Sequence, residues 1–115
     1  MWSCAGADVL PLAALGWDPR PRATGCAPWV PRGEGTSWTR APTPEEVVGA
    51  VRDGIDWLCQ QPNKTRTRRV LLYAWNENSE GGWIVPTLGE RDARVSALEK
   101  ARGGRPWGCE SPALD

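Results

Sequence analysis

The fold expected of this chain follows from one segment, Val70-Leu71-Leu72-Tyr73-Ala74-Trp75-Asn76-Glu77-Asn78-Ser79-Glu80-Gly81-Gly82-Trp83-Ile84-Val85-Pro86. It opens as a short apolar run with the length and composition of a buried β-strand. At residue 76 it changes into a polar, acidic segment that ends in two glycines, which is typical of a loop. Glu77 and Glu80 therefore follow the carboxyl end of a predicted strand. In α/β barrels, catalytic residues lie at this end of the strands.

A second candidate strand lies at residues 9–15, where the apolar run includes a proline that restricts it to the start or the edge of a sheet. The segment 16–22 (Gly-Trp-Asp-Pro-Arg-Pro-Arg) follows as an extended turn, because residues that precede proline avoid the helical region. Residues 23–41 show no periodicity and contain several prolines and glycines, so they predict a long loop. Trp29 and Trp38 in this loop provide either a stacking surface for a sugar or anchors that pack on the fold.

A helix is predicted to begin at Thr43-Pro44-Glu45-Glu46, where threonine suits the N-cap, proline the first helical position and Glu46 a capping box. Apolar residues then recur at helical spacing and mark one face of the helix, namely Val47, Val48, Val51, Ile55 and Leu58. Pro62 cannot continue the helix and is expected to end it. A weaker apolar stripe predicts a second helix within residues 87–102. The order strand, loop, helix, strand, acidic loop, helix predicts two βα units with parallel strands and a right-handed crossover.

The composition narrows the class of partner. The chain has 115 residues, enough for one domain, and its 14 basic and 14 acidic residues cancel. A net charge of zero favours neither nucleic acid nor an anionic membrane as a partner. The sequence has no apolar run long enough to span a bilayer and no convincing signal peptide. The sequence therefore does not specify the cellular compartment, and it is compatible with an extracellular or periplasmic parent protein.

The four cysteines, Cys4, Cys26, Cys59 and Cys109, are far apart in the sequence, and the chain contains no histidine. This pattern argues against a zinc site, so we expect no metal and no cofactor. It also excludes Ser-His-Asp and Cys-His mechanisms within the chain. Free buried thiols are favoured over disulfides, although an oxidising compartment would allow disulfides to form.

Residues 74–86 resemble the last-strand signature of the family 99-like and family 71-like glycoside hydrolases and of the related polysaccharide-biosynthesis (WbsX-type) domains. These proteins typically read Trp-Asn-Glu-Trp-x-Glu-Gly followed by Glu-Pro, and this chain matches at Trp75-Asn76-Glu77, Glu80-Gly81 and Pro86. It departs from the pattern at Asn78 and Val85, and Ser79 stands where the endo-mannosidase relatives often have histidine, which leaves the substrate class open. The segment 16–22 is similar to the end of the preceding barrel strand in the same group.

The fold implied by this resemblance is α/β: the C-terminal quarter of a (β/α)8 barrel, about its last two βα units, with long Pro/Gly-rich loops. This part is expected over residues 9–102, with disordered segments at 1–8 and 103–115. A full barrel needs about 200 residues or more. The chain is therefore interpreted as a fragment or truncated form of a longer protein, and its open sheet edges are a candidate surface for self-association.

The resemblance also implies residue roles. Glu77 would be the base that deprotonates a sugar 2-hydroxyl, and Glu80 the general acid and then the base of a retaining mechanism. Glycosidases need two such carboxyl groups, and two nearby carboxylates oppose double ionisation, so one can stay protonated. The substrate-binding residues implied by the family are Trp17, Asp18, Arg20, Trp75, Asn76 and Trp83.

Three functions remain open at the level of sequence. The first is a glycoside-hydrolase-like protein acting on a glycan or polysaccharide, inactive where the other barrel strands are absent. The second is a WbsX-type polysaccharide-biosynthesis or sugar-binding domain without hydrolase activity. The third is a small protein with an inherited but decayed motif and no carbohydrate activity. The structural alternative for Glu77 and Glu80 is an acidic loop whose side chains cap the next helix.

Overall fold

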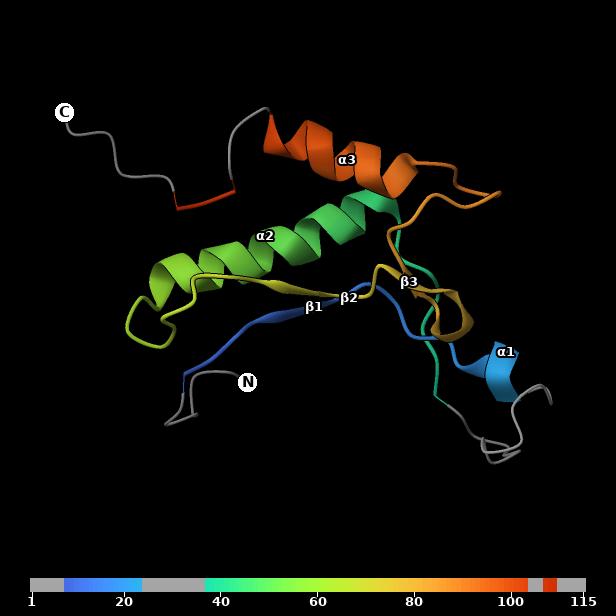
Figure 1. Ribbon diagram of the computed structural model, residues 1–115, viewed down its shortest axis with the longest axis horizontal. Helices are drawn as coiled ribbons and strands as arrows, with labels where there is room; N and C mark the ends of the chain where they lie inside the picture. The colour runs from blue at the N-terminus through green and yellow to red at the C-terminus, as the bar shows by residue number, and fades with distance from the viewer. Residues whose placement is uncertain (1–7, 24–36, 104–106, 110–115) are drawn as a thin grey trace.

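The computed structural model describes residues 8–23, 37–103 and 107–109. The disorder expected at residues 1–8 and 103–115 falls mainly on residues outside this description. In chain order the elements are β1 (Leu12–Ala14), α1 (Arg20–Ala23), α2 (Pro44–Gln60), β2 (Leu71–Tyr73), β3 (Asn76–Glu77), the 3-10 helix η2 (Asn78–Glu80), β4 (Gly82–Trp83) and α3 (Ala93–Arg102). Figure 1 shows α2 and α3 stacked on one side of β1 and β2.

The two predicted strands pair in parallel, as their order along the chain indicated. Leu12 is opposite Leu71 and Ala14 is opposite Tyr73 in the β1–β2 sheet. Both strands are shorter than the apolar runs that predicted them. β1 begins after a proline and ends at Ala14, two residues before Gly16, whose φ of 129° turns the chain. The described residues form two small two-stranded sheets and no barrel, so the expected partial barrel stays a prediction.

Helix α2 confirms the predicted start and apolar stripe. The Glu46 backbone N–H donates to the Thr43 hydroxyl at 3.3 Å, and the Glu46 carboxylate accepts the Thr43 backbone N–H at 2.8 Å, which completes the capping box. Val47, Val51 and Leu58 are buried on the face toward the sheet. The helix ends at residue 60, two positions before the proline that cannot continue it.

The second helix is shorter than the predicted 87–102, since α3 begins only at residue 93. Thr87 and Arg91 instead exchange two backbone hydrogen bonds of 3.0 and 2.7 Å across a tight turn. The Thr87 hydroxyl accepts the N–H of Glu90 at 3.1 Å. Such a local bond between a side chain and the backbone competes with helix formation, and here the turn forms instead.

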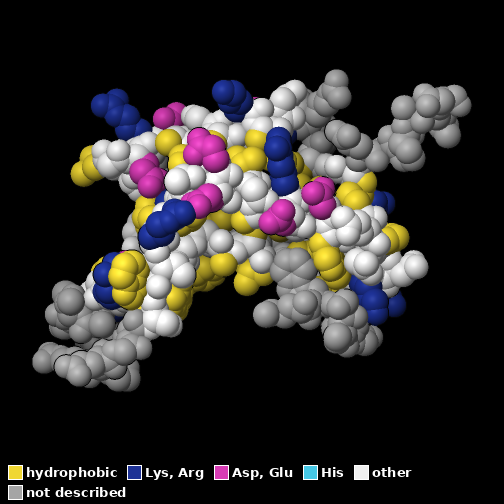
Figure 2. Space-filling model, turned by 180° about the vertical axis from the view of Figure 1, so that it is seen from behind, with side chains coloured by type: hydrophobic (Ala, Val, Ile, Leu, Met, Phe, Trp, Pro, Cys, Tyr) yellow, Lys and Arg dark blue, Asp and Glu magenta, His cyan; other side chains and the backbone are white. Residues whose placement is uncertain are grey.

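The core lies between the helices and one face of the β1–β2 sheet. Its members are Leu15, Val47 and Ile84, with Leu72, Val95 and Leu98 packed against them. On the opposite face, Leu12 and Leu71 are 45% and 53% exposed. Apolar side chains correspondingly emerge along the lower side of the molecule in Figure 2. The sheet therefore has one covered face and one uncovered apolar face.

A buried arginine fixes the loops at the carboxyl ends of the strands. Arg94 of α3 is 2% exposed. Its guanidinium donates to the carbonyl oxygens of Leu15 (3.4 Å), Trp83 (2.9 Å) and Pro42 (3.0 Å). It also pairs with the Glu90 carboxylate at 2.7 Å. Three segments far apart in the sequence are thus held to one side chain.

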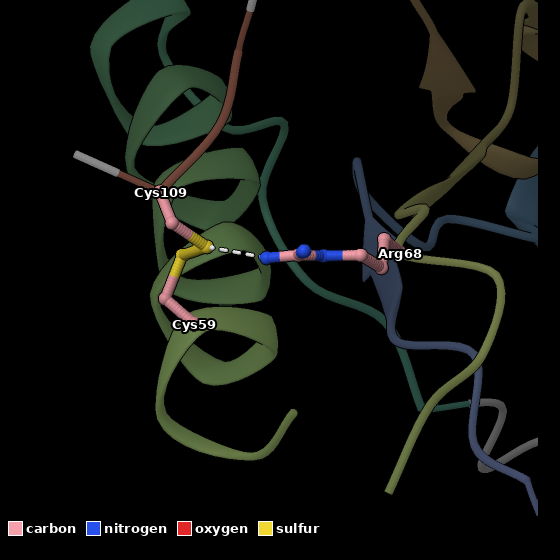
Figure 3. The surroundings of a disulfide bond; sticks show 3 residues. All are labelled: Cys59, Arg68 and Cys109. Carbon is pink, nitrogen blue, oxygen red and sulfur yellow. Dashed lines mark hydrogen bonds between the residues drawn. A yellow bond between two sulfur atoms is a disulfide. The ribbon is translucent and has the colours of Figure 1, made fainter. Parts of the chain in front are cut away.

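A disulfide joins Cys59, near the end of α2, to Cys109, with Cα atoms 5.4 Å apart and a sequence separation of 50 (Figure 3). The expectation of free thiols is therefore wrong for this pair. The spacing in the sequence could not reveal it, because the two cysteines meet only through the packing of the chain after α3 back onto α2. Cys4 and Cys26 lie outside the described residues.

Candidate functional site

The two glutamates lie on one tight turn at the carboxyl end of β2. Strands β3 and β4 pair antiparallel, with Glu77 opposite Gly82, and η2 closes the connection between them. Gly81 has a φ of 76°, which is the left-handed conformation that glycine adopts at no steric cost. Gly81 therefore allows the chain to turn back directly after Glu80.

One guanidinium binds both glutamates. The Nη2 atom of Arg22 is 2.6 Å from Glu77 Oε1, and its Nη1 atom pairs with Glu80 Oε1. The Nε atom donates to the Ser79 hydroxyl at 2.9 Å, and Ser79 in turn lies 3.0 Å from Glu77 Oε1. Three donor nitrogens of Arg22 are thus engaged, and the two carboxylates are held close together.

Tyr73, the last residue of β2, completes this cluster. Its hydroxyl donates to Glu80 Oε2, so Glu80 is held by Arg22 on one oxygen and by Tyr73 on the other. This hydrogen bond raises the pKa of Tyr73 above its usual value, because ionisation of the phenol would place two anions side by side. We call Arg22, Tyr73, Glu77, Ser79 and Glu80 the carboxylate cluster.

Close backbone contact brings the turn after β1 against the turn after β2. The N–H of Asp18 donates to the Glu80 carbonyl at 2.6 Å. A Cβ atom on Gly16 would lie 2.2 Å from the Gly81 carbonyl oxygen, and one on Gly81 would lie 2.7 Å from the Asp18 nitrogen. Glycine at both positions is therefore what allows α1, with Arg22, to reach the glutamates.

Asp18 and Arg20, both predicted to face a sugar, pair with each other instead of joining the carboxylate cluster. The Nε and Nη2 atoms of Arg20 each donate to Asp18 at 2.7 Å, and the guanidinium lies 3.6 Å from the ring centre of Trp38. The hydrogen bond from Arg20 lowers the pKa of Asp18. The structure thus places Asp18 beside the glutamate turn through its backbone, while its side chain is occupied by Arg20.

The predicted aromatic residues separate into two kinds. Trp17 and Trp75 are 43% and 58% exposed and could stack on a ligand. Trp83 lies against Arg94, whose guanidinium is 4.0 Å from its ring centre, and its indole Nε1 is buried without a hydrogen-bond partner in the described part of the chain. Asn76 is exposed on β3. Trp29 lies outside the described residues.

The space beside the glutamate turn is small. A cavity of about 90 Å³ lies there, bordered by Asp18, Asn78 and Trp83 among others. A water molecule occupies about 30 Å³ in the liquid, so this cavity would take water and is too small for a sugar ring. A sugar would have to bind on the open surface formed by the carboxylate cluster and the exposed tryptophans.

The structure does not support the alternative in which the glutamates cap the next helix. The N-cap of α3 is Asp92, which makes no side-chain capping bond. The partners of Glu77 and Glu80 are Arg22, Ser79 and Tyr73.

Arg22, Ser79 and Tyr73 were not among the residues expected at the site. The sequence did indicate that an arginine would bind the glutamates, because two adjacent carboxylates require a counter-charge and the turn after the first strand contains two arginines. The sequence did not show which of the two would reach the glutamates. Tyr73 had a weaker signal in its place at the carboxyl end of a predicted strand.

The described residues contain no group of three His, Cys, Asp or Glu side chains that could hold a metal ion. The same part of the chain has no helix long and apolar enough to cross a membrane. Comparisons with known protein families, with curated proteins and with solved structures find no match to this chain. The resemblance to glycoside hydrolases therefore rests on residues 16–22 and 74–86 and stays a prediction.

Proposed function

We propose that the carboxylate cluster is the sugar site of a glycoside-hydrolase-like protein that acts on a glycan or polysaccharide. The observation that carries this proposal is the meeting of Glu77 and Glu80 on one guanidinium at the carboxyl ends of two parallel strands. Retaining glycosidases hold their two carboxyl groups about 5 Å apart. Two groups bound to neighbouring nitrogens of one guanidinium are compatible with such a short separation.

In this proposal Glu77 is the base toward a sugar 2-hydroxyl, and Glu80 is the general acid and then the base. Tyr73 positions Glu80 through its hydrogen bond to Oε2 and leaves Oε1 on the side of Arg22. Arg22 lies between the two carboxylates, where the glycosidic oxygen would have to approach. Hydrolysis therefore requires Arg22 to move aside, which its position on the one-turn helix α1 favours.

The uncovered sheet face supports the view that the chain supplies about two βα units of a larger barrel. Leu12 and Leu71 point away from α2 and are half exposed. In a (β/α)8 barrel this face would be covered by inward-pointing side chains of the other strands. In our proposal these strands also complete the sugar site, so the isolated chain is inactive as a hydrolase.

A WbsX-type or other sugar-binding domain without hydrolase activity is the second candidate. It is favoured by the ion pairs of Arg22, which occupy both glutamates, and by the exposure of Trp17 and Trp75. Exposed aromatic faces bind sugar rings by stacking and need no acid or base.

The test is a titration of the purified chain with α-mannan and α-glucan oligosaccharides, followed by tryptophan fluorescence and by analysis of the products. Saturable binding that is lost in Glu77→Gln and Glu80→Gln, and kept in Glu99→Gln, is expected for a sugar site at the cluster. Glu99 is a suitable control because it is also paired with an arginine but lies on α3. Products would favour the hydrolase, whereas binding without products is expected of both candidates for the isolated chain. No binding to any of these glycans would contradict both candidates.

A further inference from the structure

A second cavity lies between the helices and the sheet, and it shares no lining residue with the carboxylate cluster. Its volume is about 410 Å³, which is in the range of small-molecule sites. Helix α2 contributes Val51, Ile55 and Leu58 to its wall, while β2 contributes Leu72 and α3 contributes Leu98. A wall of aliphatic side chains binds a hydrocarbon chain by removing its surface from water.

The opposite wall is formed by residues 107–109, which follow α3. The disulfide between Cys59 and Cys109 holds this segment against the end of α2 (Figure 3). The indole of Trp107 adds a large apolar surface to the wall. The shape of the cavity therefore depends on the disulfide.

Among the described residues that line this apolar cavity, Arg68 carries the one positive charge. The guanidinium of Arg68 points toward the disulfide in Figure 3, and its Nη2 atom is 3.5 Å from the Cys109 sulfur. Sulfur is a weak acceptor, so this contact leaves the guanidinium free to bind a better one. Within residues 8–23, 37–103 and 107–109, no carboxylate pairs with Arg68 and none lines the cavity. An apolar cavity with one uncompensated cation is complementary to an apolar molecule with one negative charge.

We propose that this cavity binds a small amphipathic monocarboxylate. Its hydrocarbon chain lies against the aliphatic side chains of α2, and its carboxylate accepts hydrogen bonds from Arg68 in place of the Cys109 sulfur. The planar fork of a guanidinium matches a carboxylate and can donate to both of its oxygens. This binding activity is separate from the proposed sugar site and does not depend on it.

The test is isothermal titration calorimetry of the oxidised chain with octanoate and with 1-octanol, which share a hydrocarbon chain and differ in the head group. We expect octanoate to bind at least about tenfold more tightly, which corresponds to one hydrogen bond between charged groups. Arg68→Gln should remove this difference and Arg69→Gln should keep it, since both arginines are exposed but only Arg68 is among the described lining residues. Equal affinities of the two ligands in the wild type, equal losses in the two variants, or no binding of either ligand would overturn the proposal.

Two further variants locate the ligand. Ile55→Trp fills the cavity from α2 and should weaken the binding of both ligands, with urea unfolding as the check that the variant folds. Cys109→Ser releases the wall formed by residues 107–109 and should also weaken both. Unchanged affinity in both variants would place the ligand elsewhere and contradict the assignment of this cavity.

Discussion

Arg94 and Arg22 both bind other groups through their guanidinium, but Arg94 stabilises the fold whereas Arg22 belongs to the candidate site. Arg94 has a side chain 1% exposed and donates to three backbone carbonyls and one carboxylate. Arg22 has a side chain 34% exposed and binds two carboxylates and a hydroxyl. Backbone carbonyls are permanent acceptors, so the contacts of Arg94 hold the loops in place. A partly exposed carboxylate such as Glu77 can exchange an arginine for water or a ligand, so the contacts of Arg22 are suited to a site.

Burial explains why the consequences of losing each arginine should differ. Removal of Arg94 would leave the carbonyls of Leu15, Trp83 and Pro42 without this donor around an almost fully buried side chain, and the 34% exposed Glu90 without its cation. Removal of Arg22 would leave Glu77, whose side chain is 37% exposed and can be solvated by water, and Glu80, which is 15% exposed and keeps the Tyr73 hydroxyl as a donor.

The largest expected effect is that of Arg94→Met, which keeps most of the side-chain volume and removes the donors. It should lower the free energy of unfolding by about 3–5 kcal/mol, because three carbonyl groups around a buried side chain and the Glu90 carboxylate lose their donor. Urea unfolding measures this, and loss of the cooperative transition would count as the same outcome. Arg102→Met, at an exposed pair with Glu99, is the control and should behave like the wild type. A loss below about 1 kcal/mol for Arg94→Met would put it in the range of surface pairs and contradict the comparison.

The second-largest loss of stability is expected for the disulfide, which holds the fold together as Arg94 does. Cys109→Ser should lower the free energy of unfolding by about 2–4 kcal/mol, since the bond closes a long loop and restricts the unfolded chain. The ionisation of Tyr73 should be unchanged in this variant. A shift of that ionisation would show that the disulfide and the carboxylate cluster are coupled.

A smaller effect is expected for Arg22→Gln. Its ion pairs are about one-third exposed at the arginine, so solvent screening limits their contribution to roughly 0.5–1 kcal/mol. The measurement is again urea unfolding, compared directly with Arg94→Met under the same conditions. An equal loss in the two variants would mean that Arg22 is as structural as Arg94.

The smallest effect on stability is expected at Tyr73, where pH is the variable. The hydrogen bond to Glu80 raises the pKa of Tyr73, so its stabilising contribution is complete below the usual phenol pKa of about 10 and is lost as pH rises through the higher folded value. Glu80→Gln should lower the pH at which the phenol ionises, and Glu90→Gln should leave it unchanged. Ultraviolet titration reports this residue alone, because Tyr73 is the only tyrosine in the chain. A wild-type phenol that ionises at the usual pH would show that the bond to Glu80 is absent.

Much of the local structure followed from the sequence. The Thr43–Glu46 capping box, the apolar stripe of α2 and the parallel pairing of the two strands were all predicted, because each depends on neighbours in the chain or on element order. The start of α3 was predicted too early, since the Thr87 hydroxyl bonds to the backbone and forms a turn. Glu77 and Glu80 were predicted as site residues, whereas Arg22, the cation that binds both, was not predicted.

The sequence by itself determined helix α2, the two parallel strands β1 and β2 and the place of Glu77 and Glu80 after the carboxyl end of β2, whereas α1 lies in residues predicted as an extended turn and loop and β3, η2 and β4 in residues predicted as a loop. Only the tertiary structure decided that Arg22 rather than Arg20 reaches the glutamates, that Arg94 is buried and that Cys59 pairs with Cys109. The reason is physical. Capping, periodicity and turn formation act over a few residues and follow from local patterns. The contacts of Arg22 with the two glutamates, the disulfide and the bonds of Arg94 to Leu15 and Pro42 instead join residues 50 or more positions apart. Such contacts depend on how α1, α2 and α3 pack at the ends of two strands, and no local pattern specifies that packing.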